Sequence, residues 1–282
     1  MPNQIGQCYS FIIAALRLAW RILPVVSLVG NANAQTSIHT AAQADTTPKY
    51  IARSNSPSAP IDGLCIDIDR ALERIDSNLH FVGDQSWMPA SRVDAELNAG
   101  DLDVACGISK TPERQKTFYF AEPPLFSTEY VLVARNDDQV NIRNWDDVRA
   151  LGDRGVILTD HGFGLVSRLA LQGGLRIDDG TTGVKSNLLK LRAGRGRFYY
   201  HRLLGLVDDI KHADMLADVR ILPVVLDRQA FYMVFGPHAP KEAIVRTQQA
   251  IAELARNGEL TKMLQKWSTP ADKLQGLHNP QP

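Results

Sequence analysis

The stretch Asp101–Glu122, DLDVACGISKTPERQKTFYFAE, carries the pattern that decides the fold. Its apolar start over 102–105 includes a β-branched valine and is too short for a helix, so we expect a strand that closes at Gly107. Polar residues follow this strand directly. Pro112 fits either a turn or the first position of a short helix that Thr111 would cap.

The loop after this strand offers groups that suit a small anion. Ser109 and Thr111 have hydroxyl groups, Gly107 contributes its backbone, and Arg114 adds a guanidinium. Hydrogen bonds from arginine to a carboxylate are strong because both partners are charged, and they are often bidentate. The sequence therefore predicts an anion site at the end of this strand, with Arg114 as its principal contact.

Four motifs occur in a fixed order around this loop. They are Gly63–Ile68 (GLCIDI), Asn98–Asp103 (NAGDLD), Thr111–Arg114 (TPER) and Phe120–Pro123 (FAEP). Together they resemble family 3 of the bacterial extracellular solute-binding proteins, which are periplasmic receptors that deliver polar amino acids and related solutes to ABC importers. The resemblance covers Ile61–Trp267, and its fidelity weakens along the chain.

This resemblance implies an α/β chain in the two-lobed periplasmic binding protein fold of type II, with a ligand cleft and a hinge between the lobes. The alternation of expected helices and strands agrees with that class. The two crossings of the hinge are expected near 125–126 and 230–231. The expected parts are 1–34 as a signal peptide, 36–125 as the first part of lobe 1, 126–230 as lobe 2, 231–268 as the returning part of lobe 1, and 269–282 as a disordered tail.

The composition fits a globular chain of this kind. It has 282 residues, of which 44% are hydrophobic and 22% are charged, enough to bury a full core in two lobes. The leader holds two arginines and no acid, so its removal leaves 29 basic residues (31 − 2) against 31 acidic ones. A net charge this close to zero argues against a nucleic acid as partner.

The first residues have the features of an export signal. Phe11–Leu28 is largely apolar, but Arg17, Arg21 and Pro24 interrupt it too often for a membrane span. Small residues of the A-x-A kind follow in Asn31–Ala34, so we expect cleavage after Ala34 and a periplasmic mature protein. The alternatives are a short uncleaved anchor and a wrongly assigned start codon.

The cysteines are compatible with export. Cys8 would leave with the leader, and the mature chain would hold Cys65 and Cys106, an even pair in an oxidising compartment. The resembled family places the segments that carry them side by side, so a disulfide and two buried free thiols both fit. No histidine near either suggests a cysteine nucleophile, and their spacing matches no zinc motif.

A second candidate region is the glycine-bearing turn over 159–164. It follows an expected strand and precedes an expected helix, so backbone N–H groups at the helix start could bind an anion. In the resembled family this turn contributes ligand contacts from the second lobe, which makes Thr159, His161 and Gly162 candidates. The alternative is a solvent-exposed turn without a ligand.

A departure from the resembled family concerns the ligand's charge. Leu188–His201 (LLKLRAGRGRFYYH) matches a family segment after which amino-acid receptors place an aspartate for the ligand ammonium. Arg202, or with one gap His201, stands there in this chain, and a cation would repel an ammonium group. We therefore expect an anionic, carboxylate-bearing solute. If the alignment slips, Asp208 or Asp209 is either surface charge or the missing acid.

The segment over 35–60 is rich in Thr, Ser, Ala and Pro, and we expect a flexible start and one short strand over 50–53. The resembled family often has a ligand-stacking aromatic residue after its first strand, and residues 54–57 (SNSP) contain none. Periodicity predicts the remaining elements. The expected helices are 67–75, 90–99, 144–151, 240–255 and 258–267, and the expected strands are 80–82, 130–134, 155–158, 219–226 and 230–235.

No catalytic or cofactor motif is apparent. The chain lacks a His-Glu-x-x-His, a Gly-x-Ser-x-Gly, a P-loop and a Cys-x-x-Cys, and its seven histidines are scattered. We expect a binding protein without cofactor or metal, monomeric, that works with the membrane permease of an ABC importer. The alternatives are a cyclohexadienyl dehydratase-like enzyme, a ligand-sensing domain, and an accessory protein of a periplasmic redox system.

Overall fold

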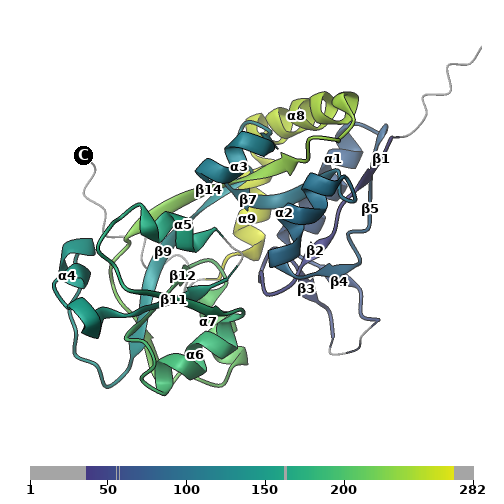
Figure 1. The fold of residues 1–282 in the computed structure, drawn as a ribbon. Coiled ribbons are helices and arrows are strands. Elements are labelled where there is room, and N and C mark those ends of the chain that lie inside the picture. The colour runs from purple at the N-terminus through teal and green to yellow at the C-terminus, as the bar shows by residue number, and fades with distance from the viewer. Residues whose placement is uncertain (1–35, 55, 57, 162–163, 270–282) are drawn as a thin grey trace, which may run out of the picture. The chain divides into compact units, whose positions relative to one another are not determined.

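The computed structural model describes residues 36–54, 56, 58–161 and 164–269 of the chain (Figure 1). The expected signal peptide over 1–34, the candidate Gly162 and all but the first residue of the expected tail over 269–282 lie outside these residues.

The described part of the chain alternates strands and helices, as expected for an α/β fold. The strands are β1 (Thr36–His39), β2 (Ala42–Gln43), β3 (Ile51–Ala52), β4 (Ile61–Asp62), β5 (Leu79–Val82), β6 (Trp87–Met88), β7 (Val104–Ser109), β8 (Tyr119–Phe120), β9 (Phe126–Arg135), β10 (Ile157–Asp160), β11 (Ile177–Thr181), β12 (Phe198–Arg202), β13 (Val219–Ile221) and β14 (Asp227–Phe235). The helices are α1 (Leu64–Ile75), α2 (Ala90–Ala99), α3 (Pro112–Thr117), α4 (Trp145–Arg149), α5 (Leu165–Ala170), α6 (Val184–Arg192), α7 (Leu206–His212), α8 (Lys241–Arg256) and α9 (Glu259–Trp267), with a 3₁₀ turn, η1 (Gly152–Gly155).

Two long strands connect the halves of the molecule. The largest sheet has the order β11-β10-β12-β9-β14-β7, with β13 beside β9 and β8 beside β14. The first half of β9 pairs antiparallel with β14, so that Phe126 lies opposite Phe231, and its second half pairs with β12. The second half of β14 pairs with β7. We call β1 to β8, α8 and α9 lobe 1, and α4 to β13 lobe 2; β9 and β14 are shared (Figure 1).

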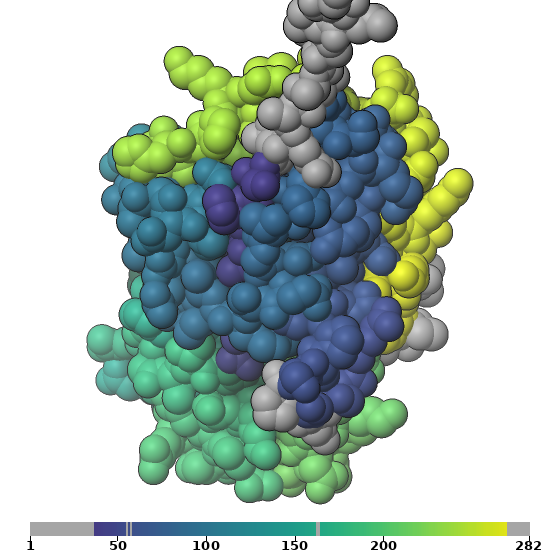
Figure 2. All heavy atoms as spheres, turned by 90° about the vertical axis from the view of Figure 1, so that its right-hand side faces the viewer, coloured from purple at the N-terminus to yellow at the C-terminus, as the bar shows by residue number. Residues whose placement is uncertain are grey.

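Lobe 1 forms where amphipathic helices cover short strands. Helix α1 buries Ile68 and Leu72, and α8 and α9 pack against it. Helix α2 ends where Gly100 adopts the left-handed conformation, which confirms the predicted cap. Strand β1 pairs in parallel with β5 and buries Ile38 completely. In Figure 2 few purple atoms of this amino-terminal segment reach the surface between the blue ones.

Lobe 2 has a core of its own. Val131, Leu158, Leu188 and Tyr199 come from β9, β10, α6 and β12 and belong to one buried apolar cluster. Because β10 and β12 are parallel, they require a crossover, and the chain between them supplies α6. The carboxyl ends of these strands carry Thr159, Asp160, His201 and Arg202.

Some boundaries differ from those predicted. The prediction of only one strand within 35–60, at 50–53, was wrong, because β1 and β2 precede β3. Their hydrophobic alternation is weak, and they pair with β5 and β6 far along the chain. The segment after the first strand is therefore 40–50, not 54–57. The strand expected over 219–226 ends at Ile221, because Pro223 lacks the N–H that a ladder needs.

Strand β7 continues past its expected end at Gly107. The register against β14 shifts between Tyr232 and Val234, which is the signature of a bulge. Gly107 absorbs it with φ +69°, a value that favours glycine. The strand β11 was not predicted, because its sequence, IDDGT, is polar and it lies at the edge of the sheet.

Candidate functional site

A cavity opens between the two lobes, where the ends of β7 and β12 face each other. The space inside it that the centre of a water molecule can reach is about 30 Å³, enough for about two waters. Its lining residues are Gln43, Thr46, Lys49, Ala90, Gly107, Ile108, Ser109 and Arg114 from lobe 1, Leu165, His201 and Arg202 from lobe 2, and Tyr130 and Phe231 from the shared strands.

Arg114 is held in this cavity by the start of helix α3. The Thr111 hydroxyl accepts a hydrogen bond from the Arg114 backbone N–H at 3.2 Å, so the predicted cap is confirmed. The Arg114 side chain is 7% exposed. Its Nε donates to Asp94 at 2.8 Å and its Nη1 donates to the Ser109 carbonyl at 3.3 Å. Asp94 thus fixes one edge of the guanidinium and leaves the other toward the cavity.

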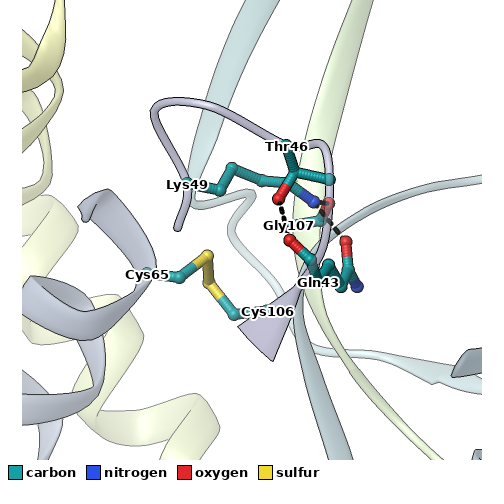
Figure 3. Close-up of a disulfide and its surroundings, with 6 residues drawn as sticks. All are labelled: Gln43, Thr46, Lys49, Cys65, Cys106 and Gly107. Carbon is teal, nitrogen blue, oxygen red and sulfur yellow. Dashed lines mark hydrogen bonds between the residues drawn. A yellow bond between two sulfur atoms is a disulfide. The ribbon is translucent and has the colours of Figure 1, made fainter. Parts of the chain in front are cut away.

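Lys49 is a second basic residue on the same wall, and Figure 3 shows its surroundings. It is 5% exposed, and its Nζ donates to Gln43 Oε1 at 2.5 Å and to the Gly107 carbonyl at 2.8 Å. Both acceptors are neutral, and no ion pair joins Lys49 to an acid among the residues described. Burial lowers the pKa of the Lys49 ammonium well below its usual range, and the charges of Arg202 and Arg114 lower it further.

Gly107 permits the close approach of Lys49 to the strand. A Cβ at position 107 would lie 2.7 Å from Lys49 Cδ, too close for a carbon contact. The neighbouring Cys106 forms a disulfide with Cys65 of α1, with 5.9 Å between their Cα atoms (Figure 3). This cross-link ties the cavity wall to the first helix of lobe 1.

Lobe 2 contributes Arg202, which also contacts lobe 1. Its Nη2 donates to the Thr47 carbonyl at 2.8 Å, its Nη1 donates to His201 Nε2 at 3.0 Å, and it lies 3.9 Å from Asp209. His201 Nδ1 in turn donates to the Arg202 carbonyl at 3.0 Å. Burial, and then the Arg202 charge, lower the pKa of His201 well below its usual range, so this imidazole is neutral.

Gly164, at the start of helix α5, packs directly over Arg114. A Cβ at this position would lie 2.9 Å from Thr111 Cγ2 and 3.2 Å from Arg114 Nη1, and the backbone has φ +72°. Glycine is needed here because any side chain would push the lobes apart. The end of the predicted glycine-bearing turn therefore does reach the Arg114 loop.

The structure brings four of the residues predicted for the site together and leaves others apart. Gly107, Ser109, Arg114 and Arg202 line the cavity. The remaining three described candidates are absent from its lining: Thr111 caps α3, Thr159 is fully buried, and His161 is exposed and bonds to Asp179 at 3.1 Å.

Three polar lining residues were not predicted, and all lie in the segment that was expected to be a flexible start. They are Gln43, Thr46 and Lys49. Their burial is unexpected. Thr46 is 1% exposed, although no obvious apolar pattern in the surrounding sequence predicts that it is buried. The signal in the sequence was a single lysine between Pro48 and Tyr50, which by itself fits a solvated loop equally well.

The charge of the lining is one-sided. Lys49, Arg114 and Arg202 are basic, and the described lining contains no aspartate or glutamate. The two arginines have acidic neighbours outside the lining, in Asp94 and Asp209. Burial raises the pKa of Asp209 to about 6, although the Arg202 charge opposes this. The ionisable side chains of the described lining, its tyrosine apart, are therefore all basic, and the acidic partners of the arginines lie outside it.

Two crossing strands, two α/β lobes and a cavity between them define the class of two-lobed periplasmic binding proteins. Residues 41–270 match the model of the bacterial extracellular solute-binding proteins, family 3. The chain belongs to this family, and the predicted fold class is confirmed.

Solved structures with the same fold include receptors and a sensor. A histidine kinase sensor domain similar to periplasmic binding proteins is 20% identical and has a TM-score of 0.68, over 83% of this chain and 97% of that chain. An amino-acid ABC transporter substrate-binding protein from Streptococcus pneumoniae, bound to L-arginine, is 18% identical with a TM-score of 0.64, over 86% and 97%.

A third structure is an ancestral amino-acid-binding protein described as a precursor of cyclohexadienyl dehydratase. It is 16% identical with a TM-score of 0.63, over 83% of this chain and 96% of that chain. At these identities the similarity shows the fold alone. No curated protein matches the sequence significantly. Within the described ranges, none of the helices has the length and apolar character needed to cross a bilayer.

Proposed function

We propose that the mature chain is a periplasmic receptor that captures a small carboxylate-bearing solute between its lobes and delivers it to an ABC importer. The observation that carries this proposal is the set of three basic side chains around one cavity, with no acid in the described lining. Arg114 would hold a carboxylate through charge-assisted hydrogen bonds, and Ser109 would add a hydroxyl.

The same charges argue against an ordinary α-amino acid. Such a ligand carries an ammonium group, which needs an acceptor or an anion when it is buried. Arg202 occupies the position where the family's amino-acid receptors were expected to have an aspartate, and Lys49 adds a further cation. Two acids lie behind the lining on this side. Asp209 is 3.9 Å from Arg202, and Asp160 is 3.5 Å from His201 and already accepts hydrogen bonds from Tyr199 and Asn187. A carboxylate without an amine therefore suits the cavity better.

Closure of the lobes would be the working step. Arg202 bonds to Thr47 across the lobes, and Gly164 packs over Arg114, so both lobes contribute to the same small space. A solute of several non-hydrogen atoms does not fit about 30 Å³, and it would enter only when the lobes separate about β9 and β14. Ligand would then shift the population toward the closed form that a permease recognises.

A dehydratase reading has less support. Loss of water from a substrate needs a general acid in the cleft. The described lining holds no carboxyl group, and the neutral His201 already accepts a hydrogen bond from Arg202. These features favour binding over chemistry.

The test is a ligand screen by thermal unfolding and calorimetry on refolded mature protein. We expect mono- and dicarboxylates to raise the unfolding midpoint and α-amino acids to leave it unchanged. A ligand at 100 times its dissociation constant stabilises the folded state by about 2.7 kcal/mol. If amino acids stabilise the protein and carboxylates do not, the proposed ligand class is wrong.

The Arg114→Ala variant tests the site itself. Truncation of one partner in a buried charge pair typically costs about 2–5 kcal/mol of binding free energy, so affinity should fall by about 30-fold or more. The matched control is Arg92→Ala, which removes an arginine from the exposed pair with Glu96 on α2. If both variants bind the carboxylate with equal affinity, Arg114 does not contact the ligand.

A further inference from the structure

Lys49 distinguishes this cavity from one built for a single carboxylate. Of the three basic side chains in the lining, Arg114 is paired with Asp94 at 2.8 Å and Arg202 lies 3.9 Å from Asp209. Lys49 is paired with no acid among the described residues, although it is 95% buried (5% exposed). Each of its two hydrogen bonds goes to a neutral oxygen.

This arrangement is unfavourable for the empty protein. A buried charge without a partner is strongly disfavoured, and two guanidinium groups nearby make the ammonium less favourable still. An uncharged side chain such as glutamine could donate to the Gly107 carbonyl at no electrostatic cost. A lysine in this place is therefore suited to an anionic partner that comes from outside the chain.

The hydrogen-bonding capacity of Lys49 supports this assignment. An ammonium group has three donors, and Gln43 Oε1 and the Gly107 carbonyl accept from two of them. One donor remains, on a side chain that lines the cavity. A single carboxylate bound at Arg114 would leave Lys49 without an anion, whereas a second acidic group would reach an unpaired cation.

We propose that the solute carries two acidic groups, one bound by Arg114 and the other by Lys49 with Arg202 beside it. Lys49 is then the residue that selects dianions over monoanions. This inference rests on the proposed function, because it names the ligand class of the same site. Short dicarboxylates have the required chemistry.

The first experiment compares succinate with butyrate, which has the same chain length and one carboxylate, and with inorganic phosphate, by calorimetry on the refolded mature protein. One charge-assisted hydrogen bond corresponds to about 10- to 150-fold in affinity. We expect succinate to bind more tightly than butyrate by that factor, and phosphate, a single compact anion, to bind less tightly than succinate. Equal binding of succinate and butyrate would overturn the inference and leave the proposed function standing. Binding of none of the three at millimolar concentration would count against both.

The second experiment uses Lys49→Gln, which keeps an amide donor for the Gly107 carbonyl, and Lys116→Gln as a control, since Lys116 is exposed on α3. In Lys49→Gln the preference for the dianion should fall by about tenfold or more, while butyrate affinity changes little. A lysine with a purely structural role would weaken both ligands equally, and that result would refute the assignment. The control should keep the preference of the unaltered protein.

Discussion

The disulfide between Cys65 and Cys106 gives the sharpest stability prediction. The two cysteines are 41 residues apart in sequence, and closing a loop of that length in the unfolded chain corresponds to about 4 kcal/mol at 25 °C in the chain-entropy model. In a chain of this size each kcal/mol shifts the unfolding midpoint by about 2–4 °C. Reduction should therefore lower the midpoint by about 8–16 °C.

The assay is calorimetric unfolding of the oxidised protein against protein refolded in reductant, with the thiol count checked by mass. The double variant Cys65→Ala/Cys106→Ala serves as control, since its midpoint should not respond to reductant. Because Cys106 adjoins Gly107, reduction should also weaken ligand binding. An unchanged midpoint after verified reduction would refute the reasoning, since it would mean that the cross-link does not restrict the unfolded chain.

Two other predictions concern a buried acid and an inter-lobe contact. Asp69 is 1% exposed, and neither of its carboxylate oxygens has a hydrogen-bond partner among the described residues. Burial raises the pKa of Asp69 well above its usual value. The charges of Asp84 and Glu73 raise this pKa further, and the charge of Arg70 opposes them. The native state thus holds this proton more tightly than the unfolded state, and stability is lost as pH rises from the unfolded pKa near 4 through the folded one. Asp69→Asn should therefore stabilise the protein by an amount that grows by about 1.4 kcal/mol per pH unit within that window, measured by urea unfolding at pH 4 and pH 7; an equal gain at both pH values would contradict this. Gly164→Ala should weaken carboxylate binding because its Cβ would meet Arg114 and Thr111, whereas Gly173→Ala, also at positive φ (+67°) but with nothing within 4 Å, should lower only stability, by about 1–2 kcal/mol. Equal affinities of the two variants would show that Gly164 does not limit closure.

The sequence allowed the prediction of those elements whose signals are local. The cap at Thr111, the helix end at Gly100 and the amphipathic face of α1 each depend on residues within a few positions of each other. The same holds for Arg114, which lies in the short helix α3, five positions after the end of a strand that its own composition predicts. Such features need no knowledge of distant partners.

Features that depend on distant partners were missed or misplaced. Strand β1 exists because it pairs with β5, some forty positions later, and its own side chains alternate only weakly. Lys49 lies at the cavity because its Nζ reaches the Gly107 carbonyl, 58 positions away in sequence. His161, a residue predicted for the site, is turned toward Asp179 instead.

The sequence by itself therefore determined the family, the α/β class and the basic loop around Arg114, because short motifs and the spacing of apolar residues depend only on neighbouring positions. The tertiary structure decided which charges share one cavity. Lys49, Arg114 and Arg202 come from three separate segments, and only the pairing of β7, β9, β12 and β14 brings them around one small space. The charge of the lining is a sum over these three segments, so no single stretch of the sequence determines it.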